Sequence, residues 1–262
     1  MRWVYLSPHF DDIVLSCGGM VWEQVQAGHQ VEVWTVCAGA PEPNEPISDF
    51  ALSLHQRWGA GTEAVAARLE EDQAAVQRLG ATTRYWDLPD CIYRRLPAPS
   101  AEAEGPWLVN GEDDLWQPLD PREEPVVERL TAWVTAMLAP ADQLVSPLSL
   151  GNHVDHRLVR AAAERASRRT GCTLWYYPDY PYVARTGVAL LEKTGEGWKT
   201  VCREVSREAL KVWQDAVASY VSQLSTFFKD RADLDASLET YWQSGGGACL
   251  WHPGQDARTI NL

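Results

Sequence analysis

Short apolar runs alternate with longer amphipathic stretches along most of the chain. Trp3 to Leu6 and Gln30 to Cys37 are rich in β-branched and aromatic residues, which is typical of buried strands. Leu15 to Ala27 lies between them with a helical pattern, so the three segments form a βαβ unit. Further strands are predicted over 82–88, 143–148 and 173–177, and helices over 63–79, 125–138 and 157–169. This alternation predicts an α/β fold with a Rossmann-like, mostly parallel sheet flanked by helices.

The pattern changes in the last third of the chain. Val188 to Leu191 and Trp198 to Val201 flank the turn-forming residues Thr194 to Gly197, which is typical of a β-hairpin. Helices are then predicted over about 207–227 and 230–242, with no site chemistry in either. We expect a single α/β domain over 1–262, in which 187–262 is a C-terminal hairpin and helical extension.

Residues 97–125 interrupt the alternation and are rich in Pro, Gly and acidic residues. We expect an insertion that serves either as a lid or binding loop, or as a solvated excursion. Its Asn110-Gly111 pair is typical of the turn of a small hairpin. Trp107 and Trp116 are candidate platforms for stacking a sugar ring, although core packing is the commoner role of a Trp.

Composition narrows the classes of function. The chain has 262 residues, 45% of them hydrophobic, and a formal net charge of −13. This charge argues against nucleic-acid and anionic-membrane partners, which require clustered Lys and Arg. The N-terminus does not resemble a signal peptide, and no apolar run approaches membrane-spanning length, so a cytoplasmic protein is expected, as a monomer or a homo-oligomer. The six cysteines form no C-x-x-C pair and are expected to be reduced thiols.

Two polar clusters directly follow predicted strands. Ser7 to Asp12 comes after the first strand, and Ser149 to His156 comes after the strand over 143–148. Because ligands bind outside the carboxyl ends of the strands in open α/β sheets, we expect the two clusters to meet at one edge. Histidines and a carboxylate are the usual ligands of catalytic zinc. Together the clusters predict a metal site, and the Asp and Tyr residues of 178–182 are further candidates at this edge.

Each cluster alone has a simpler interpretation. Asp11 or Asp12 is a favoured helix cap, and Asp155 is more simply the cap of its helix than a partner of a ligand histidine. Arg68 and Glu71, three residues apart, form a typical surface ion pair. Two histidines and one Asp also describe the facial triad of non-haem iron oxygenases, but the double-sheet barrels of those enzymes differ from the alternation predicted here.

The sequence Ser7-Pro8-His9-Phe10-Asp11-Asp12, taken with His153-Val154-Asp155-His156, resembles the PIG-L/LmbE-like family of zinc-dependent N-acetylglucosamine deacetylases. The helix from Arg68 to Gly80 and the position of Asp90 after the third strand are similar to the family's pattern as well, so the resemblance covers roughly residues 1–180. The commonest family form reads Ala-His-Pro-Asp-Asp-Glu. The chain departs from it at Phe10 and Ile13, which leaves the choice of substrate open.

The resemblance implies a role for each polar residue of the two motifs. It implies Zn²⁺, or Fe²⁺ or another divalent metal, bound by three residues: His9, Asp12 and His156. Asp11 would then be the general base for a metal-bound water, and His153 would stabilise or protonate the tetrahedral intermediate. Asp155 would be a second-layer partner of a ligand histidine. The residues that would contact substrate are Arg68, Asp90 and Tyr93.

The resemblance also implies a reaction. We expect a zinc-dependent hydrolase that removes an N-acyl group, most simply acetyl, from a glucosamine-containing sugar or conjugate, so that the partner is a small amino-sugar substrate. The alternatives are an amidase acting on a thiol conjugate or another N-acyl metabolite, and a non-catalytic metal-binding or sugar-binding protein.

Overall fold

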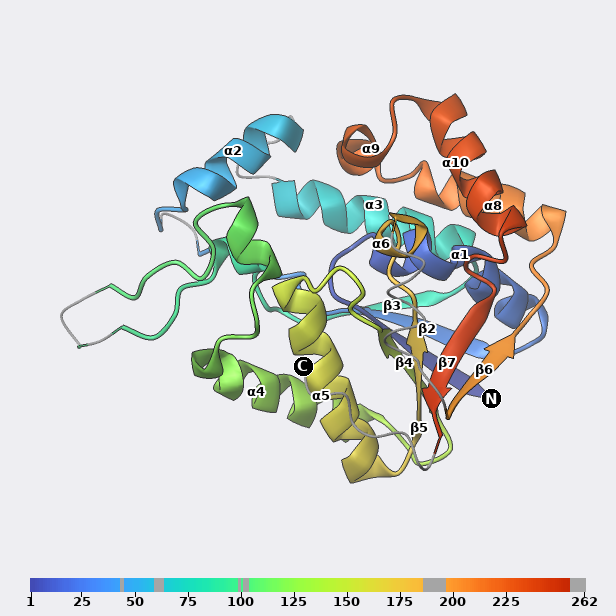
Figure 1. The fold of residues 1–262 in the computed structure, drawn as a ribbon, viewed down its shortest axis with the longest axis horizontal. Coiled ribbons are helices and arrows are strands. Elements are labelled where there is room, and N and C mark those ends of the chain that lie inside the picture. The colour runs from blue at the N-terminus through green and yellow to red at the C-terminus, as the bar shows by residue number, and fades with distance from the viewer. Residues whose placement is uncertain (43–44, 59–63, 99, 101–103, 186–196, 255–262) are drawn as a thin grey trace.

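The computed structural model describes residues 1–42, 45–58, 64–98, 100, 104–185 and 197–254. The described residues form a central sheet of seven strands in the order β3-β2-β1-β4-β5-β7-β6 (Figure 1). The parallel strands are β1 (Arg2–Ser7), β2 (Gln30–Thr35), β3 (Thr82–Tyr85), β4 (Gln143–Pro147) and β5 (Thr173–Tyr177). At one edge β7 (Cys249–Pro253) runs antiparallel to both β5 and β6 (Trp198–Cys202). The predicted fold class is confirmed.

Alternating side chains of β1 divide between two hydrophobic cores. Trp3 and Tyr5 belong to the core on one face, whereas Val4 and Leu6 belong to the core on the other. The first face is covered by α1 (Asp12–Gln26), α3 (Ala64–Arg78), α8 (Arg207–Val217) and α10 (Arg231–Gln243). The second face is covered by α4 (Glu124–Met137) and α5 (Val154–Thr170) (Figure 1).

The remaining helices of the described residues are short. They are α2 (Asp49–Trp58), α6 (Tyr182–Arg185), α9 (Val221–Phe227) and the 3₁₀ helices Cys91–Tyr93, Glu112–Trp116 and Pro121–Glu123. In the described residues no helix is both long and apolar enough to cross a bilayer.

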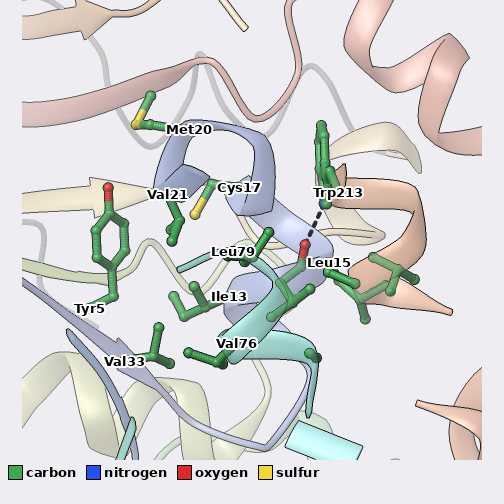
Figure 2. Close-up of a cluster of buried hydrophobic side chains, with 14 of the residues drawn as sticks. Tyr5, Ile13, Leu15, Cys17, Met20, Val21, Val33, Val76, Leu79 and Trp213 are labelled. Carbon is green, nitrogen blue, oxygen red and sulfur yellow. Dashed lines mark hydrogen bonds between the residues drawn. The ribbon is translucent and has the colours of Figure 1, made fainter. Parts of the chain in front are cut away.

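The C-terminal helices pack tightly on α1. Trp213 of α8 is fully buried, and its indole Nε1 donates to the carbonyl of Val14 (Figure 2). That carbonyl is available because α1 is interrupted at Cys17, whose φ and ψ are −153° and 29°. Gly18 lets the indole approach, since a Cβ there would lie 2.5 Å from Trp213 Cδ1. The C-terminal extension is therefore joined to the helix that follows the first motif.

Three local predictions differ from the structure. The stretch 207–227 is two helices, α8 and α9, separated at 218–220. Asn110 and Gly111 lead into the 3₁₀ helix Glu112–Trp116, and the antiparallel bridge of this region joins Arg95 to Trp107 instead. Cys202 and Cys249 form a disulfide, so the expectation of six reduced thiols was wrong; strand pairing brings together two residues 47 positions apart.

Part of the predicted C-terminal hairpin cannot be compared with the structure. Its first arm, 188–191, and its turn, 194–197, lie wholly or mostly outside the described residues. Among the described residues, the second arm corresponds to β6, which pairs with β7.

Candidate active site

The two motifs meet where the strand order reverses. Strand β1 lies between β2 and β4, so the connections leaving β1 and β4 turn to opposite sides and leave a crevice at their carboxyl ends. The first motif follows β1 and the second follows β4. This arrangement brings His9 within 5.0 Å of His153 and 5.6 Å of His156, measured between ring centroids.

The carboxylate of Asp12 lies between His9 and His156. Its Oδ2 lies 3.3 Å from His9 Nδ1, and its Oδ1 lies 3.4 Å from His156 Nε2. The Asp12 carboxylate also accepts a 2.8 Å hydrogen bond from the backbone N–H of His9, which fixes its direction. One nitrogen of each imidazole therefore faces the same carboxylate.

The opposite nitrogen of each imidazole is held by a second buried carboxylate. His9 Nε2 lies 3.0 Å from Asp155 Oδ2, and His156 Nδ1 lies 2.5 Å from Asp179 Oδ1. Asp155 is itself positioned by Arg94, whose Nη1 is 2.7 Å from its Oδ1. A carboxylate behind an imidazole is the usual arrangement behind a metal-ligating histidine, because it sets the ring's tautomer and orientation.

Asp155 does not cap α5, so the interpretation favoured from sequence was wrong. The N-cap is His153, whose Nδ1 accepts from the backbone N–H of Asp155 at 3.3 Å. Asp155 lies in the first turn with its side chain fully buried, and its Oδ2 also accepts from the backbone N–H of Cys91.

The charges of the cluster favour a cation. Burial lowers the pKa of His156, but the carboxylates of Asp12 and Asp179 outweigh burial and raise that pKa to about 10. At His9, burial is likewise outweighed by neighbouring carboxylates, Asp90 foremost, so its pKa is raised well above the usual range. A field that holds protons on two buried imidazoles also favours a metal ion in their place.

The donor set fits a divalent metal. One donor atom each of His9, His153 and His156 lies within 4.8 Å of the other two, and Asp12 contacts two of these rings. Nitrogen and carboxylate donors in this number suit zinc and related ions. The structure thus brings the three expected ligands together and places His153 beside them.

Asp11 lines the same cleft as the three histidines and faces Arg68. Its Oδ1 is 3.9 Å from Arg68 Nη2, and both side chains are largely buried. Burial raises the pKa of Asp11, Arg68 opposes the shift, and the charge of Asp12 adds to it. Arg68 is not a surface partner of Glu71, whose carboxylate accepts instead from the backbone and hydroxyl of Ser222.

Two of the three residues expected to contact substrate lie in the cleft, and the third does not. Arg68 and Asp90 line one cleft with the histidines, and Asp90 Oδ2 is 3.6 Å from His9 Nε2. Tyr93 does not line this cleft. Its hydroxyl instead meets His55 Nε2 at 2.6 Å.

The cleft has a volume of about 220 Å³ and a largely aromatic and apolar wall. Trp116 stands against His153 and Tyr182, with ring centroids 5.5 and 5.8 Å away. Wall residues that the sequence did not single out come from α2 and α9 and include Leu54, Trp58, Gln223, Thr226 and Phe227. Neither helix begins directly at the end of a strand: α2 starts well beyond the end of β2, and α9 follows α8. The rule that located the motifs, which concerns residues directly after a strand, therefore does not point to them.

The sheet is Rossmann-like, and a cluster of histidines and a carboxylate lies where its strand order reverses. Together these features define an α/β enzyme with a candidate metal site. A model of the PIG-L family, described as GlcNAc-PI de-N-acetylase, matches residues 4–167. The chain belongs to this family, as the resemblance of the two motifs indicated.

Individual relatives agree with this assignment. The chain is similar to a 2'-N-acetylparomamine deacetylase of Niallia circulans, with 30% identity over 244 residues that cover 88% of this chain and 83% of that protein. Among solved structures, it is similar to the zinc-inhibited form of teicoplanin deacetylase Orf2, at 26% identity and a TM-score of 0.73, over 96% of this chain and 97% of that one. A deacetylase–teicoplanin complex gives 28% identity and a TM-score of 0.76 over 97% of both chains. The expected class of enzyme, a hydrolytic N-deacetylase, is confirmed.

Proposed function

We propose that this enzyme removes an acetyl group from the 2-amino nitrogen of a glucosamine unit carried by a larger scaffold. The observation that carries the proposal is the pair of imidazoles held from behind by Asp155 and Asp179, with their other nitrogens turned to Asp12. This arrangement suits metal-assisted amide hydrolysis, and relatives of the chain are deacetylases of amino-sugar compounds.

Three residues would hold the metal: His9, Asp12 and His156. When bound, a divalent ion such as Zn²⁺ polarises the amide carbonyl and lowers the pKa of water beside it. The zinc-inhibited form of a similar deacetylase supports zinc as an ion that fits such a site.

Asp11 is suited to act as the general base. Its carboxylate lines the cleft, and burial raises its pKa towards the range in which it can both accept and return a proton. Arg68, 3.9 Å away, opposes this shift and keeps the carboxylate available. In this role Asp11 takes a proton from the attacking water and passes it to the leaving amine.

His153 is suited to stabilise the oxyanion. Burial, together with the neighbouring His9 and His156, lowers the pKa of His153 to about 3, so the ring is neutral. Because its Nδ1 accepts from the backbone N–H of Asp155, its proton lies on Nε2. A neutral ring with a fixed N–H donates to the developing oxyanion without reorganising.

The cleft wall supports an acceptor larger than a free monosaccharide. Trp58, Trp116, Tyr182 and Phe227 give it aromatic surfaces on several sides, on which sugar rings and apolar scaffold groups pack. The net charge of −13 additionally favours cationic acceptors, such as amino-sugar conjugates with further free amines.

A substrate panel tests the proposal. The zinc-loaded enzyme is incubated with N-acetylglucosamine, 2'-N-acetylparomamine, an N-acetylglucosaminyl glycopeptide and an N-acyl thiol conjugate, and loss of acetyl is followed by mass spectrometry. We expect release from a conjugated sugar. No release from any sugar, or release from the thiol conjugate alone, would overturn the proposal.

The adjacent aspartates provide a matched pair of variants. Asp11→Asn should retain metal and lower kcat by about 10²- to 10⁴-fold, since it removes general-base catalysis. Asp12→Asn should lose metal, measured by elemental analysis of the purified protein. Turnover that survives Asp11→Asn, or equal metal content in Asp12→Asn and wild type, contradicts these roles.

A further inference from the structure

A second buried carboxylate, Asp72, lies behind the first motif. It is on α3, one turn after Arg68, and its side chain is fully buried. Its Oδ1 lies 2.7 Å from the hydroxyl of Tyr220, and its Oδ2 lies 3.0 Å from that of Tyr85 and 3.4 Å from that of Thr35. Asp72 therefore joins α3 to β2, to β3 and to the connection between α8 and α9.

Tyr220 extends this contact to the first motif, at Phe10. Its hydroxyl is 2.7 Å from the carbonyl oxygen of Phe10, the residue between His9 and Asp11. Tyr220 is buried and comes from the C-terminal extension, 210 positions away along the chain. Through it, the extension contacts the backbone that sets the directions of both neighbouring side chains.

The two short contacts of Tyr220 require a proton on Asp72. A phenol has one proton, and a carbonyl oxygen only accepts, so Tyr220 donates to Phe10 and accepts from its other partner. A carboxylate cannot donate, but a carboxylic acid can. Oδ2 already faces two hydroxyl donors, Tyr85 and Thr35, which leaves the proton on Oδ1.

We propose that Asp72 is a positioning residue: as a neutral carboxylic acid it donates to Tyr220, which in turn donates to the Phe10 carbonyl and holds His9 and Asp11 in place. Removing the acid's proton turns the Tyr220 hydroxyl towards the carboxylate, because a charge-assisted hydrogen bond is the stronger one. The Phe10 carbonyl then loses this donor. This inference rests on the proposed function for its kinetic test.

The surroundings of Asp72 support a neutral acid. The groups that face it are Tyr220 from the α8–α9 connection, Tyr85 from β3, Thr35 from β2 and, farther off, the negative charge of Asp11. Burial raises the pKa of Asp72 to about 7, Asp11 adds to this shift, and the hydroxyl donors oppose it. The acid is therefore neutral below about pH 7 and ionises above it.

Comparing pH profiles of kcat tests the proposal. In the wild type, kcat should fall as the pH rises through the pKa of Asp72. Asp72→Asn is always neutral and its amide can donate to Tyr220, so it should keep kcat within about threefold at pH 6 and lose this decline. Tyr220→Phe removes the donor to Phe10 and should lower kcat by about ten- to a hundredfold, as expected for a misplaced catalytic group.

Tyr85→Phe is the matched control. It removes a phenol from the same carboxylate without a hydrogen bond to Phe10, so kcat at pH 6 should stay near wild type. Because that phenol stabilises the charged carboxylate, its loss should move the decline to higher pH. Equal losses of kcat in Tyr85→Phe and Tyr220→Phe would mean that both are general packing effects and would overturn the proposal.

A readout independent of activity separates this inference from the proposed function. The infrared carbonyl band of a protonated carboxylic acid should be present in the wild type at pH 6, should fade towards pH 8 and should be absent from Asp72→Asn. If the band is absent from the wild type, the inference fails even when the enzyme deacetylates sugars. If Asp11→Asn retains turnover, the proposed function fails whatever the band shows.

Discussion

Asp179→Asn tests whether a carboxylate behind His156 prepares it to bind metal. Asp179 is 1% exposed and accepts two hydrogen bonds, from His156 Nδ1 at 2.5 Å and from the backbone N–H of Leu150 at 3.1 Å. The amide of Asn has the same shape but only one accepting oxygen. Either orientation therefore loses one of the two bonds.

Both orientations are costly. If the amide oxygen faces His156, the Leu150 N–H meets an NH₂ group and is left unpaired, which costs about 1–3 kcal/mol of stability. If the NH₂ faces His156, Nδ1 must accept, and the ring's proton moves to Nε2, the nitrogen that faces Asp12. A protonated Nε2 cannot ligate. We expect metal affinity to fall about 10- to 100-fold, or about 1.4–2.7 kcal/mol.

A zinc titration against a competing chelator measures this difference. Asp142→Asn is the control, because Asp142 is also buried and accepts from Arg2 and from the Ala139 N–H, but it lies just before β4, at the opposite end of that strand from the motif. It should lose stability while zinc affinity stays at the wild-type value. Wild-type zinc affinity in Asp179→Asn would refute the orienting role.

Two further variants test packing and the cleft wall. Gly18→Ala places a Cβ 2.5 Å from the buried Trp213 ring and should lower the free energy of unfolding by about 1–3 kcal/mol in denaturant unfolding. Gly111→Ala is the control, because no atom lies within 4 Å of its added Cβ, and it should leave stability unchanged. Equal stabilities of the two variants would contradict the close packing of α8 on α1. Trp116→Ala should raise KM for a conjugated substrate about tenfold, because this ring lines the cleft. Trp107→Ala should leave KM unchanged, because that ring stacks on Arg95 in a separate cavity. The reverse order of effects would exclude Trp116 as the ring on which the sugar stacks.

The local pattern was sufficient for the elements that carry the site. Strands were predicted over 3–6 and 143–148, with the motifs directly after them, and the structure has strands over 2–7 and 143–147. The parallel direction of these strands then follows from the alternation of strands and helices. For that reason His9, Asp12 and His156 could be expected in one cluster before any contact was known.

Contacts between distant segments were not visible in the same way. Capping preference favoured Asp155 as a helix cap, but the fold buries it between Arg94 and His9. The helical pattern predicted one helix over 207–227, but the structure has a break at 218–220, which places Tyr220 against Phe10. Whether residues 97–125 act as a lid stays a prediction, although Leu115 and Trp116 from this segment line the cleft.

The sequence by itself determined the class of fold and the edge of the sheet at which the two motifs lie, because each depends on the pattern within one segment. The assignment of metal ligands came from the family resemblance of the motifs and stays a prediction. Only the tertiary structure decided which carboxylates contact the histidines from behind and how the C-terminal extension contacts the first motif. The separation along the chain is 23 positions for His156 and Asp179, 146 for His9 and Asp155, and 210 for Phe10 and Tyr220. No periodicity within a segment specifies which side chains meet across such separations. Packing of the helices on the sheet specifies them, since it fixes the direction of every buried side chain.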